Sequence, residues 1–147
     1  MKSRPMVLLV EDDPDLTRFA DLALRLSGYR AVTAYDGESA MRAARQDRPD
    51  VVVLDLRLPG LDGWQVLAAL QREPGLASVP VVILTASADP RDCERAQTAR
   101  IADFVLKPLT ADRLLEVVER ALAAPRAAPS GAVALGRERQ PAGPPAS

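Results

Sequence analysis

The chain has 147 residues, 48% of them hydrophobic, and a formal net charge of -1. This length and apolar content suit one domain with a buried core. The mixed, nearly neutral charge gives no sequence-independent attraction to nucleic acid or to an anionic membrane. No apolar run approaches the ~20 residues of a membrane span, and the N-terminus lacks a signal-peptide core. We therefore expect a cytoplasmic protein that binds neither nucleic acid nor membrane directly.

Three scarce residue types narrow the chemistry that the chain can perform. Histidine is absent, which excludes a Ser-His-Asp triad and a His-ligated metal. The single cysteine, Cys93, excludes an internal disulfide and a cysteine metal cluster. Of the 19 basic residues only Lys2 and Lys107 are lysines. Because arginine fills the other basic positions, Lys107 is a candidate functional residue.

Apolar patterns predict five strands that alternate with five helices along the chain. The strands are expected at residues 6–10, 31–35, 51–55, 81–85 and 104–106. The helices are expected at residues 14–27, 36–46, 64–72, 90–99 and 110–123. This alternation predicts a parallel sheet with helices on both faces. The pattern alone leaves the order of the strands open.

The C-terminal segment differs in composition from the rest. Residues 125–147 are mostly Pro, Ala, Gly and Ser without an apolar period, so we expect a disordered tail after a single domain at 1–124. No output domain is expected from this chain. The alternative is that the tail begins a linker to such a domain.

Reactive side chains stand at the ends of four predicted strands. Glu11 and Asp12 follow the first strand and Asp55 closes the third. Thr85 closes the fourth and Lys107 follows the fifth. Because parallel strands share a direction, these groups are expected at one edge of the sheet, where open α/β sheets place their sites.

Carboxylates held close together repel one another and favour a bound cation. Oxygen ligands of this kind suit Mg²⁺. Asp55 would then be a nucleophile that accepts a phosphoryl group as an acyl phosphate. Lys107 would neutralise charge on the phosphoryl oxygens, and Thr85 would donate a hydrogen bond to them. Taken alone, Asp55 is typical of a turn or cap and Asp12 of a helix N-terminus; their combination favours a site.

Four separated motifs resemble the receiver domain of bacterial two-component response regulators. They are Val10-Glu11-Asp12-Asp13-Pro14, Val53-Leu54-Asp55 with Leu58-Pro59-Gly60-Leu61-Asp62-Gly63, Leu84-Thr85-Ala86, and Phe104-Val105-Leu106-Lys107-Pro108. The resemblance extends over residues 6–123. It implies a flavodoxin-like, doubly wound (βα)5 three-layer sandwich with a parallel sheet in the order 2-1-3-4-5.

The resemblance also implies a function and a ligand set. Asp55 would be phosphorylated by a partner histidine kinase or histidine phosphotransfer protein. Mg²⁺ would be held by Asp12, Asp55 and the backbone carbonyl of Arg57, with Glu11 acting mainly through water. A cis peptide is expected between Lys107 and the following proline.

A switch is part of the same resemblance. Phosphorylation would draw the hydroxyl of Thr85 inward and let the ring of Phe104 turn into the vacated space. The face formed by the fourth helix, fifth strand and fifth helix would then bind or release a downstream protein, as a monomer or as a phosphorylation-dependent dimer. Phe104 replaces the tyrosine that is more common in the family. The fourth helix has few apolar residues, so we expect it to be locally soft.

Two other functions stay open at this point. One is a Mg²⁺-dependent phosphatase or phosphotransferase with an aspartyl nucleophile; such enzymes usually carry an aspartate two residues later, where this chain has Arg57. The other is a receiver-like interaction module that does not require phosphate. We expect a signalling protein with at most slow self-dephosphorylation rather than an enzyme, and the side chain of Arg57 could either pair with the phosphoryl group or hinder water.

Overall fold

The computed structural model describes residues 4–86 and 89–124. The expected tail at 125–147 lies outside these residues. Within them the expected alternation of strands and helices is confirmed, and no helix is both long and apolar enough to cross a bilayer.

A single parallel sheet forms the centre of the described part of the chain. Its strands run in the order β2-β1-β3-β4-β5, which confirms the flavodoxin-like topology. The strands are β1 (Met6–Val10), β2 (Arg30–Ala34), β3 (Val51–Asp55), β4 (Val81–Thr85) and β5 (Asp103–Leu106).

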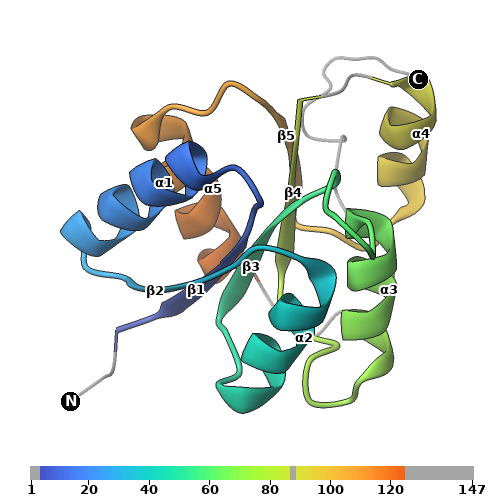
Figure 1. Cartoon of the computed structure of the whole chain (residues 1–147), viewed down its shortest axis with the longest axis horizontal. Helices are drawn as coiled ribbons and strands as arrows, with labels where there is room; N and C mark the ends of the chain where they lie inside the picture. The colour runs from blue at the N-terminus through green and yellow to red at the C-terminus, as the bar shows by residue number, and fades with distance from the viewer. Residues whose placement is uncertain (1–3, 87–88, 125–147) are drawn as a thin grey trace.

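Helices cover both faces of this sheet, so that the molecule has three layers (Figure 1). They are α1 (Pro14–Leu26), α2 (Gly37–Gln46), α3 (Gly63–Arg72), α4 (Pro90–Thr98) and α5 (Ala111–Ala123). One apolar cluster joins the sheet to α1 and α5, and a second joins it to α2, α3 and α4. The helix that follows β1, α1, packs on one face, and the helix that precedes β3, α2, packs on the other. The winding therefore reverses between the neighbouring strands β1 and β3, as in a doubly wound fold.

The central strands are buried along their whole length. Every residue of β1, β3 and β4 is buried, which explains why their sequences are continuous apolar runs rather than alternating ones. Charged groups in these segments can therefore stand only where a strand ends. The strand pattern thus directs the functional side chains to the carboxyl edge of the sheet.

The ends of the elements follow local chemistry. Each helix has a side-chain N-cap, supplied by Asp13, Asp36, Asp62, Asp89 and Thr110. These caps satisfy backbone N–H groups that the first helical turn leaves unpaired. The second strand begins one residue earlier than predicted, because the N–H of Arg30 bonds to the carbonyl of Pro5 at 2.9 Å, and it ends before the exposed Tyr35.

Two glycines allow the chain to turn tightly after β3. Gly60 has a φ of 75°, a left-handed conformation that glycine adopts without steric cost. At Gly63, an added Cβ would stand 2.6 Å from the carbonyl oxygen of Asp55 and 2.7 Å from the Cα of Leu56. The first turn of α3 therefore lies directly against the end of β3.

We expect Gly63→Ala to lower the free energy of unfolding by about 1–3 kcal/mol, because the atoms that meet the new methyl group belong to the backbone and cannot rotate away. Urea unfolding measures this loss. Gly75→Ala is the matched control, since a Cβ there meets nothing within 4 Å. Equal stability of the two variants would contradict the close approach.

We also expect backbone amides of α4 to exchange with solvent faster than those of α5. Of the residues in α4, only Ala96 is buried, whereas α5 buries Leu114, Val117, Val118 and Ala121. Few buried contacts favour local opening. Hydrogen exchange followed by NMR or mass spectrometry tests this expectation, and equal protection in the two helices would refute it.

Candidate functional site

The site is assembled by the alignment of β1 with β3. Val10 pairs with Leu54 in the parallel register, so that the next residues, Glu11 and Asp55, lie side by side at the carboxyl edge. This edge lies at the reversal of the winding, where a crevice is expected in open α/β sheets. The predicted grouping of the acidic residues is therefore present.

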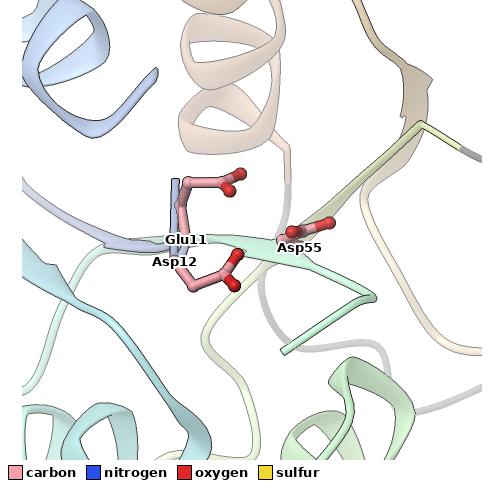
Figure 2. Close-up of side chains that lie close together, drawn as sticks. All are labelled: Glu11, Asp12 and Asp55. Atoms are coloured by element: carbon pink, nitrogen blue, oxygen red, sulfur yellow. The ribbon is translucent and has the colours of Figure 1, made fainter. Parts of the chain in front are cut away.

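Three carboxylates gather at this edge. Glu11 and Asp12 leave the end of β1, and Asp55 lies beside them at the end of β3 (Figure 2). One oxygen from each lies within 4.8 Å of the others. Glu11 and Asp55 are buried, with 1% and 3% of their surface exposed, whereas Asp12 is exposed. Hard oxygen donors at this spacing fit a divalent cation such as Mg²⁺.

The ammonium group of Lys107 enters the cluster from the end of β5. Its Nζ lies 2.9 Å from Glu11 Oε1 and 3.5 Å from Asp55 Oδ2. The backbone N–H of Lys107 donates to the carbonyl of Thr85 at 2.8 Å, and the expected cis peptide to Pro108 is present. A lysine predicted to act on the phosphoryl group is thus placed beside Asp55.

Burial and charge act against one another in this cluster. Burial raises the pKa of Asp55 above its ordinary value, and the charge of Lys107 partly opposes the rise. Burial likewise raises the pKa of Glu11, against the hydrogen bond from Lys107. Burial lowers the pKa of Lys107, but its hydrogen bond to Glu11 and the charge of Asp55 outweigh this, so that its pKa is raised. A bound cation would relieve the remaining repulsion between the carboxylates.

The loop after β3 also contacts the carboxylate of Asp55. The backbone N–H of Arg57 lies 3.3 Å from Asp55 Oδ1. Lys107 approaches the other oxygen, Oδ2, so that both oxygens of Asp55 have a positively polarised neighbour. Glu11 is held in a similar way, because its Oε2 accepts a hydrogen bond from the N–H of Asp13 at 3.0 Å.

The two residues predicted to form a switch lie on neighbouring strands. Thr85 is buried at the end of β4, and Phe104 on β5 is half-buried. Phe104 pairs in register with Ile83, two residues before Thr85, so both belong to the sheet face covered by α2, α3 and α4. Their placement is compatible with a coupled movement.

One group near the site was not predicted from the sequence. Asp92 in α4 accepts a hydrogen bond from the guanidinium of Arg57 at 3.2 Å and another from Trp64 Nε1 at 2.9 Å. The guanidinium of Arg95 lies 4.8 Å from the centre of the Trp64 ring. Trp64 is buried in the apolar cluster that joins the sheet to α2, α3 and α4, and its indole N–H also has a polar partner. An acidic residue in the first turn of a helix is ordinarily explained by the helix dipole, which conceals this role.

Comparison with known proteins gives the family. The family model described as the response regulator receiver domain matches residues 7–119. The protein named "Probable transcriptional regulatory protein TcrX" of Mycobacterium tuberculosis is 46% identical over 110 residues, which cover 74% of this chain and 46% of that protein. The chain thus spans about half the length of the curated relatives that it matches.

Solved structures agree with this result. The chemotaxis response regulator CheY4 of Vibrio cholerae has a TM-score of 0.75 at 25% identity, over 81% of this chain and 99% of that one. The receiver domain of a sensor histidine kinase from Pseudomonas aeruginosa has a TM-score of 0.76 at 32% identity, over 82% and 99%. That structure holds a magnesium ion in its active-site cleft.

Sequence motifs, strand order and the acidic edge with its lysine all agree with these matches. The chain therefore belongs to the response regulator receiver domain family of two-component signalling.

Proposed function

We propose that this protein is a phosphoacceptor and that Asp55 is the residue phosphorylated. The observation that carries this proposal is the convergence of Glu11, Asp12 and Asp55 on one edge with the ammonium of Lys107 between two of them. Two buried carboxylates beside one ammonium group leave negative charge without full compensation, which is costly in a protein interior. A phosphoryl group together with a cation matches the charges of this cluster.

The donor would be a phosphohistidine on a histidine kinase or a histidine phosphotransfer protein. A carboxylate oxygen of Asp55 attacks phosphorus and forms an O–P bond, while the P–N bond to the donor imidazole breaks and its electron pair remains on nitrogen. Because these 147 residues contain no histidine, the donor imidazole lies outside them. The product is an acyl phosphate on Asp55.

Each residue of the site has a separate part in this reaction. Lys107 neutralises charge on the phosphoryl oxygens, and Thr85 donates a hydrogen bond to them. The backbone N–H of Arg57 holds the carboxylate of Asp55 in place. Asp12, Asp55 and the backbone carbonyl of Arg57 would hold Mg²⁺, with Glu11 acting mainly through water. When bound, this ion supplies charge neutralisation at the transferring phosphoryl group.

The readout would be the α4-β5-α5 face. Thr85 moves toward the phosphoryl group and Phe104 turns inward, which changes the surface offered to a downstream protein. The chain spans about half the length of its curated relatives. We propose that the receiver domain ends near residue 124 and that it acts as a monomer or as a phosphorylation-dependent dimer. Turnover of a small phosphate ester is not expected, since Arg57 offers no acid or base at its position.

Phosphorylation can be measured by intact mass after incubation with Mg²⁺ and acetyl phosphate. We expect the protein to gain one phosphoryl mass and Asp55→Asn to gain none, because the amide is not a nucleophile of comparable strength. Asp47→Asn is the matched control, since Asp47 is an exposed carboxylate paired with Arg30. Equal gain by Asp55→Asn, or no gain by the unmodified protein, would refute the proposal.

Stability without metal offers a second test. The pKa of Asp55 is raised in the folded protein, so folding favours its protonated form. The stability gained in this way is fully present below the ordinary pKa of an aspartate and is lost as pH rises through the folded pKa. We therefore expect metal-free Asp55→Asn at pH 7 to be more stable than the unmodified protein by about 1 kcal/mol, and the difference to shrink toward pH 4. Urea unfolding at both pH values measures this.

Addition of Mg²⁺ should reverse the order of these stabilities. The ion binds the folded state and stabilises the unmodified protein more than Asp55→Asn, which has lost a ligand. In Asp47→Asn the response to Mg²⁺ should match that of the unmodified protein. An equal Mg²⁺ response in Asp55→Asn would exclude Asp55 as a ligand.

A further inference from the structure

Asp92, in the first turn of α4, connects this helix to two segments beside the proposed phosphorylation site. Its Oδ2 lies 3.2 Å from Arg57, and its Oδ1 accepts the indole N–H of Trp64 at 2.9 Å. Only 14% of the Asp92 side chain is exposed. Both oxygens of one mostly buried carboxylate thus connect α4 to two other segments.

Each of these two segments also touches Asp55. Arg57 donates its backbone N–H to the carboxylate of Asp55 at 3.3 Å. Trp64 directly follows Gly63, whose Cα lies so close to Asp55 that an added Cβ would meet its carbonyl oxygen. The connection from Asp55 to α4 through Asp92 therefore requires one intermediate residue, Arg57, on the first path and two, Gly63 and Trp64, on the second.

Few apolar contacts hold α4, so these polar contacts form a relatively large part of its attachment. Ala96 is the only residue that α4 buries, so the apolar contribution of this helix is small. The guanidinium of Arg95 over the Trp64 ring adds a cation–π contact to the same place. A change at Asp92 should consequently alter how firmly α4 is held against α3.

The contact between Arg57 and Asp92 can be displaced. The Arg57 side chain is 59% exposed, and ion pairs this exposed are weak. A phosphoryl group on Asp55 would carry up to two negative charges close to the backbone of Arg57, and guanidinium groups bind phosphate oxygens in a bidentate geometry. The phosphoryl group is therefore a strong competitor for this arginine.

We propose, on the basis of the phosphorylation proposed above, that Asp92 is a positioning residue which ties α4 to Arg57 in the unphosphorylated protein. A phosphoryl group on Asp55 draws the guanidinium of Arg57 away from Asp92 and thereby loosens α4. This path runs along the surface loop after β3 and is separate from the paired movement of Thr85 and Phe104.

Trp64 makes the path observable, since it is the only tryptophan of the chain. The full chain is titrated first with Mg²⁺ alone and then with beryllofluoride, a phosphoryl mimic, while Trp64 emission and the exchange of α4 amides are recorded. We expect the mimic to change the emission beyond the effect of Mg²⁺ and to accelerate exchange in α4 by about three- to tenfold.

Two variants remove the proposed link. In Asp92→Asn, which keeps an oxygen for Trp64 but loses the charge that pairs with Arg57, α4 should exchange about three- to tenfold faster even without the mimic. In both Asp92→Asn and Arg57→Gln, the mimic should change emission and α4 exchange clearly less than it does in the unmodified protein, because only the path through Thr85 and Phe104 remains. Glu94→Gln and Arg91→Gln are matched controls on exposed positions of α4, and both should respond as the unmodified protein does.

Intact mass after acetyl phosphate treatment is measured on every variant, so that a lost ability to be phosphorylated is distinguished from a lost response of α4. If the unmodified protein gains no phosphoryl mass, the proposed function fails and this inference fails with it. If it gains the mass but α4 and Trp64 respond equally in Asp92→Asn, Arg57→Gln and the controls, only the role of Asp92 is overturned. Loss of the response in Glu94→Gln as well would also overturn it, because a general charge effect would then suffice.

Discussion

The burial of two carboxylates beside one ammonium group is the interaction on which the proposed site depends. Glu11 and Asp55 are almost completely removed from solvent, and Lys107 lies within 3.5 Å of both. Burial disfavours the ionised carboxyl groups, and a single lysine does not fully offset two of them, so both carboxyl pKa values remain raised. The folded protein therefore retains an unfavourable electrostatic contribution that a cation and a phosphoryl group can relieve.

The sheet and the site both result from the burial of the central strands on both faces. Strands buried on both faces exclude charged groups from their interior, and the order 2-1-3-4-5 places the ends of β1 and β3 side by side. The side chain of Lys107 reaches these ends from beyond β4, at the end of β5. The close approach at Gly63 brings α3 against the end of β3. Stability and function consequently compete at this edge, since the positions that the topology brings together are the ones that hold the repelling charges.

The sequence could predict much of this arrangement because its signals are local. Continuous apolar runs identified β1, β3 and β4, and the polar residues at or directly after their ends, Glu11, Asp55 and Thr85, identified the edge. The strand order came from resemblance, since periodicity carries no information about which strands pair. The start of β2 was predicted one residue late because Arg30 bonds through its backbone, which side-chain patterns do not reveal. Asp92 was missed because its partners, Arg57 and Trp64, are 35 and 28 residues away in sequence.

The two proposed paths from Asp55 to α4 differ in their physics. The path through Thr85 and Phe104 crosses a packed sheet face, where side chains have discrete arrangements and salt has little influence. The path through Arg57 and Asp92 is an ion pair whose arginine is 59% exposed, so that dissolved salt screens it. High ionic strength would therefore weaken the tie between α4 and the loop after β3 while leaving the buried path intact. Because α4 buries only Ala96, it can respond to a charge on Asp55 without any large rearrangement of the core.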